Sequence, residues 1–213
     1  MKLVIVDYGV GNIRSLTNAF EFIGCEVELT RDPERIIAAD RLVLPGVGSF
    51  PYCMQKLKEY SLDNAIKTYV SQGKPMLGIC VGMQMLFDFG EEHGGAKGLG
   101  IIPGRVIHFS RYAEEKQLPV PARLPHIEWS AVSWNKNADA DAVFASTALD
   151  GFYYFVHSFV CVPDKPEHLL ATTTYAGIDY CSMAINGRVC GVQFHPEKSG
   201  ALGLSLLKSF VFN

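Results

Sequence analysis

The N-terminal part of the chain alternates between two hydrophobic patterns. Short segments rich in apolar and β-branched residues are typical of buried strands, and they occupy residues 2–6, 26–30, 41–44 and 75–79. Segments with apolar residues at every third or fourth position predict amphipathic helices, and they occupy residues 13–23, 53–72 and 81–89. Because strands and helices alternate, we expect a parallel sheet with helices on both faces.

The pattern changes after residue 100, where strand-like runs follow one another. These runs occupy residues 104–109, 130–134, 152–160, 169–176, 180–187 and 188–194. We expect them to form an antiparallel addition to the same sheet or a small second sheet. Residues 111–125 contain three prolines and predict a surface loop, and residues 200–211 predict a closing helix. The predicted fold class is α/β: a mostly parallel central sheet flanked by helices, with an antiparallel extension.

Composition narrows the function classes. The 213 residues are enough for one sizeable domain or two small ones, and a net charge of −3 gives no reason to expect nucleic acid or an anionic membrane as partner. No apolar stretch approaches the length of a membrane span, and no C-x-x-C pair suggests a zinc or redox site. Six cysteines occur singly at positions 25, 53, 80, 161, 181 and 190. We expect a cytoplasmic protein without a metal or cofactor.

Cys80 occupies a position where a strand pattern changes to a helix pattern. Glycines stand two places before and after it, at Gly78 and Gly82, so the segment fits G-x-S-x-G with cysteine replacing serine. In such an elbow the nucleophile lies in a strained turn between strand and helix. The following helix would stabilise a thiolate, and the N–H of Val81 would point to a developing oxyanion. The alternative is a core cysteine between two glycines.

A nucleophilic cysteine needs a base, and the base needs a group that orients it. Two histidines have a carboxylate two positions later: His195 with Glu197, and His126 with Glu128. In an extended segment residues i and i+2 point to the same side. Because a strand pattern directly precedes His195, we favour His195 as the base and Glu197 as its orienter. His157 lies in an aromatic strand and is expected either in the core or at a pocket wall.

Motifs along nearly the whole chain resemble the class I, or triad, glutamine amidotransferases. They are DYGVGNIRSL (7–16), LPGVGSF (44–50), LGICVGMQMLF (77–87), GLGIIPGRV (98–106), PHIEW (125–129), YFVHSF (154–159), GVQFHPEKSG (191–200) and GLSLLKSF (203–210). Within that family they are most similar to the glutaminase subunits of imidazole glycerol phosphate synthase, a histidine-pathway enzyme. The resemblance implies one flavodoxin-like glutaminase domain over residues 1–213.

The resemblance also implies roles for matching residues. Cys80 attacks the side-chain amide of L-glutamine, His195 transfers the proton and Glu197 orients His195. The oxyanion N–H groups come from Val81 and from the loop that contains Gly46, Val47 and Gly48. The residues around glutamine are Gly48, Gln84, His157, Ser158 and Phe159. The residues facing the partner are Asn12, Trp129 and Lys198.

The implied partner is a (βα)₈-barrel cyclase in a heterodimer, which receives the ammonia. Ammonia released into water would be protonated, and a chain of this length has little room for a second active site. Glu128 and Ser130 stand where the family usually has glycine and asparagine. These differences leave open a related glutaminase that supplies another synthase, such as one for amino sugars of surface polysaccharides. A catalytically silent regulatory subunit and a cysteine peptidase on the same fold are further alternatives.

Overall fold

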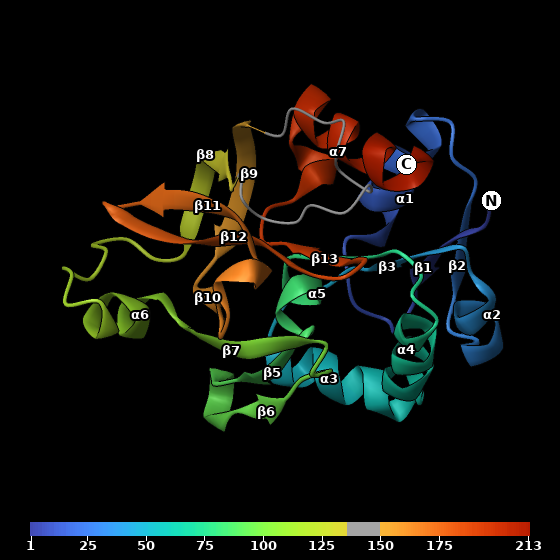
Figure 1. The fold of residues 1–213 in the computed structure, drawn as a ribbon, viewed down its shortest axis with the longest axis horizontal. Coiled ribbons are helices and arrows are strands. Elements are labelled where there is room, and N and C mark those ends of the chain that lie inside the picture. The colour runs from blue at the N-terminus through green and yellow to red at the C-terminus, as the bar shows by residue number, and fades with distance from the viewer. Residues whose placement is uncertain (136–149) are drawn as a thin grey trace.

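A parallel sheet of five strands forms the centre of the molecule, in the order β2-β1-β3-β4-β13 (Figure 1). The computed structural model describes residues 1–135 and 150–213. The strands are β1 (Leu3–Val6), β2 (Val27–Thr30), β3 (Arg41–Leu44), β4 (Met76–Ile79) and β13 (Val189–Val192). All except β2 are buried at every position, as expected for strands covered on both faces. The four strands predicted in the N-terminal part are confirmed.

Helices cover both faces of this sheet, which confirms the predicted fold class. α1 (Ile13–Phe22) and α7 (Gly200–Phe212) pack together on one face (Figure 1). α2 (Pro33–Ala38), α3 (Phe50–Glu59) and α4 (Leu62–Ser71) lie on the other. The short helix α2 escaped the sequence analysis, although its start is marked: the Asp32 carboxylate accepts a 3.0 Å hydrogen bond from the N–H of Glu34.

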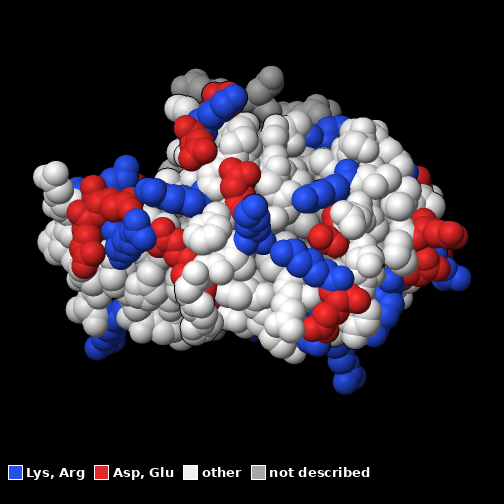
Figure 2. Space-filling view, turned by 90° about the horizontal axis from the view of Figure 1, so that it is seen from below, with Lys and Arg blue, Asp and Glu red and all other residues white. Residues whose placement is uncertain are grey.

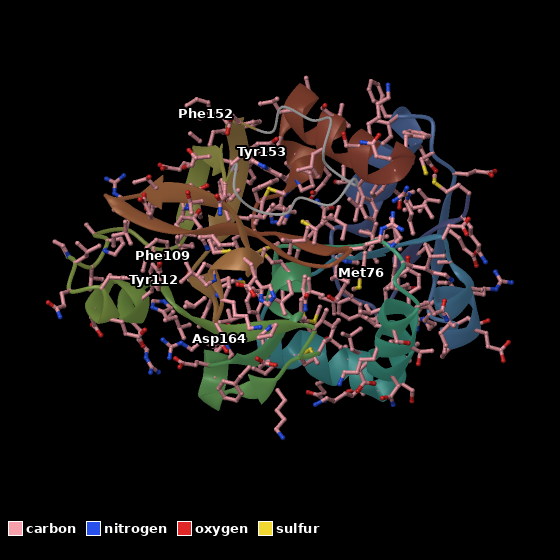
Figure 3. The ribbon with its side chains drawn as sticks, in the orientation of Figure 1. Met76, Phe109, Tyr112, Phe152, Tyr153 and Asp164 are labelled. Carbon is pink, nitrogen blue, oxygen red and sulfur yellow. The ribbon has the colours of Figure 1, made fainter. Side chains whose placement is uncertain are left out.

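The second half of the chain continues the same sheet, as one of the two expectations had it. From β13 the order runs through β12 (Ile178–Asn186), β10 (Phe159–Pro163), β7 (Ile102–His108), β5 (Phe87–Gly90) and β6 (Ala96–Lys97). A branch from β12 contains β11 (Leu169–Tyr175), β8 (His126–Trp134) and β9 (Gly151–His157). Side chains alternate along β9, where Phe152 is exposed and Tyr153 is buried (Figure 3).

The prediction that residues 188–194 form an antiparallel addition was wrong in part. A tight turn at Gly187 reverses the chain after β12, so β13 is antiparallel to β12 but parallel to β4. The strand therefore belongs to the central sheet. This position matters for function because the ends of β4 and β13 lie side by side at one edge of the sheet.

Three other segment predictions were wrong in part. Residues 53–72 form two helices because the chain breaks at Ser61, which has a left-handed φ of 56°. The expected helix 81–89 is the single turn α5 (Val81–Gln84), and the apolar residues after it form β5. The expected loop 111–125 begins inside α6 (Phe109–Glu115). Short apolar runs do not distinguish a helix from a strand by periodicity alone.

Three single-turn 3₁₀ helices, η1 (Glu92–Gly94), η2 (Pro166–His168) and η3 (Pro196–Lys198), complete the described elements.

Basic and acidic side chains are interspersed on the face of the molecule that is seen from below the view of Figure 1 (Figure 2). In the part of the chain that the structure describes, no helix combines the length and the apolar character needed to cross a bilayer.

Candidate active site

Cys80 lies on a strained turn between β4 and α5, as the sequence predicts. Its φ of 55° and ψ of −114° are unusual for a residue with a side chain. The flanking glycines make the turn possible: a Cβ on Gly78 would lie 2.7 Å from the carbonyl oxygen of Gly82. On Gly82 a Cβ would overlap the carbonyl oxygen of Leu44. The backbone of the turn is therefore packed directly against the end of β3.

The loop after β3 lies against this turn. A Cβ on Gly46 would be only 2.6 Å from the nitrogen of Gly82, so glycine permits the close approach. The loop is held by the hydroxyl of Tyr8, which donates a 2.7 Å hydrogen bond to the carbonyl oxygen of Pro45. Gly48 has a φ of 89°, a conformation that favours glycine. The sequence analysis expected this loop beside Cys80, and the structure places it there.

His195 comes to the same edge of the sheet from β13, the neighbour of β4. Its Nδ1 lies 2.9 Å from Oε1 of Glu197, and the two side chains are 4% and 3% exposed. The backbone is fixed by two further bonds: the N–H of His195 donates to the carbonyl oxygen of Tyr154, and the Ser199 hydroxyl donates to the carbonyl oxygen of His195. In the described part of the chain, Nε2 of His195 is buried without a hydrogen-bond partner. It is therefore available for proton transfer in the cavity.

The electrostatic surroundings favour a charged imidazole. Burial lowers the pKa of His195, but its interactions with Cys80 and Glu197 outweigh burial and raise the pKa to about 10. A carboxylate on Nδ1 stabilises the imidazolium and directs the Nε2 side of the ring away from itself. A cysteine beside such an imidazolium is the arrangement found in cysteine nucleophiles activated by histidine.

A cavity of about 310 Å³ opens at this edge of the sheet and contains both Cys80 and His195. It is lined by Val47, Gly48, Cys80, Val81, Gln84, Glu92, Pro125, Val156, His157, Ser158, Phe159 and His195. The expected glutamine-binding residues all lie in this lining. Of the expected oxyanion residues, Val47, Gly48 and Val81 line the cavity, whereas Gly46 lies behind it against the turn.

The family description "Glutamine amidotransferase class-I" matches residues 4–213. The chain belongs to the class-I glutamine amidotransferase family. The protein called "Imidazole glycerol phosphate synthase subunit HisH" in Geobacter metallireducens is 40% identical over 211 residues, covering 99% of this chain and 98% of its own. Its namesake in Salinibacter ruber is 42% identical over 206 residues, covering 97% of this chain and 92% of its own.

Solved structures show the same amidotransferase fold. The structure of PurLQS from Thermotoga maritima matches with a TM-score of 0.72 at 19% identity, covering 99% of this chain and 97% of that chain. A crystal structure described as a glutamine amidotransferase matches with a TM-score of 0.70 at 18% identity, covering 98% of both chains.

Two polar residues of this amidotransferase site were missed by the sequence analysis. The amide Nε2 of Gln193 lies 3.8 Å from the sulfur of Cys80, and its Oε1 accepts a 3.1 Å hydrogen bond from Gln84. Glu92 reaches the cavity from η1, and its carboxylate accepts a 2.7 Å hydrogen bond from the N–H of Phe50. Gln193 stands two positions before His195 in a strand-like run, so alternation could have placed it on the same side. No local pattern marks Glu92.

The rival pair of His126 and Glu128 lies away from the nucleophile. His126 is fully buried and is not part of the cavity lining. Burial lowers its pKa to about 4, although the neighbouring Glu128 opposes this shift. The ring nitrogens of His126 lie 3.0 Å from the Tyr180 hydroxyl and 2.9 Å from the Ser130 hydroxyl. The preference for His195 as the base is consistent with this geometry.

Of the three residues expected at the partner interface, Trp129 and Lys198 lie near one another at the surface, on either side of Tyr154. Trp129 is 51% exposed and packs edge-on to Tyr154, with ring centroids 6.2 Å apart. The ammonium group of exposed Lys198 lies 5.7 Å from the centroid of the same tyrosine ring. Asn12 precedes α1, which packs against η3 and thus against the segment that carries Lys198. Their role at an interface stays a prediction.

Two further sequence predictions concern the helix after Cys80 and the binding of metal ions. The helix after Cys80 has only four residues, so its dipole contributes little at this position. Within residues 1–135 and 150–213 the structure contains no group of three or more His, Cys, Asp or Glu side chains placed to bind a metal ion.

Proposed function

We propose that the protein is a glutaminase, the subunit of an imidazole glycerol phosphate synthase that hydrolyses L-glutamine and delivers ammonia to a cyclase subunit. The observation that carries the chemistry is the joint placement of Cys80 and His195 in one cavity, with Glu197 behind the imidazole. The pathway is supported by relatives named as this subunit, which are about 40% identical over almost the full chain.

The proposed reaction begins with the sulfur of Cys80 attacking the side-chain amide carbon of glutamine. A C–S bond forms, and negative charge develops on the carbonyl oxygen. The proposed donors to that oxygen are the N–H groups of Val81 and of the loop at Val47–Gly48, because these residues line the cavity that contains Cys80. His195 then gives its Nε2 proton to the amide nitrogen, and ammonia leaves. Glu197 stabilises the imidazolium before this proton transfer, because a carboxylate on Nδ1 favours the charged ring.

Water completes the proposed cycle. His195, now neutral, removes a proton from a water molecule that attacks the γ-glutamyl thioester. The C–S bond breaks, glutamate is released and the proton returns to the Cys80–His195 pair. Gln193 supports the sulfur as a leaving group, because its amide N–H points to a sulfur that becomes negative.

Recognition of glutamine fits the lining of the cavity. Glu92 provides a carboxylate for the α-ammonium group of the substrate, while its bond to the N–H of Phe50 fixes its position. Gln84 and the segment from His157 to Phe159 supply amide and backbone groups for the remaining polar atoms. A cavity of this volume suits an amino acid better than an extended peptide, which supports glutaminase over peptidase activity.

The proposed acceptor of the ammonia is a (βα)₈-barrel cyclase subunit that docks over Asn12, Trp129 and Lys198. Direct transfer is needed because free ammonia is protonated at neutral pH and then no longer acts as a nucleophile. We further propose a cytoplasmic heterodimer. The test is co-purification with the cyclase of the same genome, followed by assays of glutamate release in the presence of the cyclase substrate.

The expected result is glutamate formation by the complex, abolished by Cys80→Ser without loss of the complex. Glutamate release that persists in Cys80→Ser would contradict the proposed chemistry. A stable complex with a different synthase, and none with the cyclase, would contradict the proposed pathway.

A further inference from the structure

The strand β9 ends the branch of the sheet, because among the described strands it pairs only with β8. Its other edge contacts η3 and the beginning of the chain segment that leads into α7 (Figure 1). The backbone N–H and C=O groups on such an edge need other partners when they are buried. For Tyr154, in the middle of β9, these partners come from the segment between His195 and Ser199.

Tyr154 and His195 form a strand-like pair into which one hydroxyl is inserted. In a hydrogen-bonded pair of antiparallel strands, two opposite residues exchange both of their N–H···O bonds. Here the N–H of His195 donates a direct 2.9 Å bond to the carbonyl oxygen of Tyr154. The second bond passes through Ser199: the N–H of Tyr154 donates to its Oγ at 3.0 Å, and the hydroxyl donates to the carbonyl oxygen of His195 at 2.6 Å. We call this arrangement the Ser199 bridge.

The hydrogens of the Ser199 bridge have only one arrangement. A backbone N–H can only donate, and a carbonyl oxygen can only accept. Ser199 has one hydroxyl hydrogen, which must therefore go to His195, while its oxygen accepts from Tyr154. Ser199 is only 2% exposed, so these groups have no solvent alternative to the bonds of the bridge.

The position of Ser199 in the sequence suggests a different role, that of a helix cap. It stands at the N-cap of α7, where serine is favoured because its oxygen can accept from the N–H groups of the first turn. In the structure its side chain makes no such capping bond. Ser199 is also not among the residues that line the described cavity with Cys80 and His195. The hydroxyl is therefore used for the backbone of His195, and neither for the helix nor for the substrate.

The Ser199 bridge closes the turn that carries both the base and its carboxylate. The carbonyl oxygen of His195 also accepts a 3.0 Å bond from the N–H of Lys198, and Glu197 lies within this turn. Nδ1 of His195 lies 2.9 Å from Oε1 of Glu197, so the two side chains move with the turn as one unit. Cys80 belongs to a different segment, after β4. A displacement of the turn would therefore change the position of the imidazole relative to the sulfur.

We propose that Ser199 is a positioning residue, whose hydroxyl fixes the backbone of His195 against β9 and thereby holds the imidazole in place beside Cys80. Loss of the hydroxyl should slow the proton transfers of His195, because these depend steeply on geometry. Binding of glutamine should change little, because Ser199 does not line the cavity. The effect on the reaction rests on the proposed glutaminase function, whereas the Ser199 bridge is a property of the chain itself.

Ser199→Ala tests the proposal by removing the hydroxyl alone. In the complex with the cyclase, with the cyclase substrate present, kcat should fall at least about tenfold and the KM for glutamine should change by less than about twofold. Hydrogen exchange reports on the bridge without reference to the reaction: the amide hydrogen of Tyr154 loses its acceptor and should exchange at least about tenfold faster. An unchanged kcat, or an unchanged exchange rate at Tyr154, would overturn the proposal.

Two control variants separate positioning from a general loss of stability. Tyr69→Phe removes a buried hydroxyl that donates a 2.7 Å bond to the carbonyl oxygen of Pro75, at the opposite end of β4 from Cys80. This variant should lower the melting temperature but leave kcat within about twofold of wild type. Ser182→Ala removes a buried serine hydroxyl without a hydrogen-bond partner in the described part of the chain, and should change neither quantity. An equal fall in kcat in Tyr69→Phe and Ser199→Ala would overturn the proposal.

Ser199→Cys provides a second test in case Ser199→Ala does not fold. A thiol is a weaker hydrogen-bond donor than a hydroxyl, so kcat should fall at least about threefold while the fold is kept. A wild-type kcat in folded Ser199→Cys would overturn the proposal. If hydrogen exchange at Tyr154 responds as expected but the wild-type complex releases no glutamate, the proposed function fails and the Ser199 bridge stands.

Discussion

Replacing Glu197 with glutamine tests how much the carboxylate behind His195 contributes. The amide keeps the size and an acceptor oxygen for the Nδ1–H, and only the charge is lost. The contact is 2.9 Å long and both side chains are almost fully buried. A hydrogen bond to a charged group contributes about 1.5–3 kcal/mol. One pKa unit corresponds to about 1.36 kcal/mol, so the pKa of His195 should fall by about 1–2 units.

The change should be visible in the free energy of unfolding as a function of pH. An unfolded histidine titrates near about 6.5, and the pKa of folded His195 is raised to about 10. The charged ring therefore stabilises the fold fully below pH 6.5, and this contribution is lost as the pH rises toward 10. Glu197→Gln should be less stable than wild type by about 1.5–3 kcal/mol at pH 6. The two stability curves should converge near pH 10.

Denaturant unfolding at a series of pH values provides the measurement, and the rate of glutamate release by the complex provides a second one. We expect kcat/KM to fall by at least about 100-fold, because the imidazolium that forms during the reaction loses its charge stabilisation. Glu167→Gln is the control: it stands in η2 in the same Pro-Glu sequence, but its side chain is 64% exposed. Parallel stability curves for wild type and Glu197→Gln would refute the reasoning.

Three further substitutions test other parts of the site. Gly82→Ala should lower the melting temperature by at least about 4 °C, because its Cβ would meet backbone atoms of Leu44 and overpacking costs about 1–3 kcal/mol; an unchanged melting temperature would contradict the packing at the elbow. Gln193→Leu should lower kcat about tenfold through loss of the N–H directed to Cys80, with little change in KM; steady-state kinetics would show the reverse if Gln193 bound substrate. Glu92→Gln should raise the KM for glutamine at least about tenfold; a normal KM would mean that the ammonium group binds elsewhere.

The sequence predicted most of the site because its residues stand at the ends of strands with strong patterns. Cys80 follows a fully buried strand, and His195 follows another, so the topology of a parallel sheet brings them to one edge. Of the expected glutamine-binding residues, Gln84 lies in the helical turn after Cys80 and Gly48 lies in the loop after β3. His157, Ser158 and Phe159 lie where β9 ends and β10 begins. Glu92 could not be found in this way, because η1 joins two short strands whose pairing depends on tertiary contacts.

The prediction of elements failed where periodicity is ambiguous. The apolar residues that follow Val81 suit a helix as well as a strand, and the structure uses them for one helical turn and then for β5. The break at Ser61 is a single left-handed residue, for which serine gives no strong signal. The parallel pairing of β13 with β4 is a long-range property that no local pattern contains.

Labelling with a diazo-ketone analogue of glutamine tests the central claim most directly. The analogue alkylates a cysteine only when the thiolate is reactive and the pocket accepts glutamine. Mass spectrometry of the complex, with the substrate of the cyclase present, should find one label per chain, on the peptide that contains Cys80. Prior incubation with glutamine should protect that peptide. A label on another cysteine, or an unlabelled Cys80 in a complex that releases glutamate, would contradict the account.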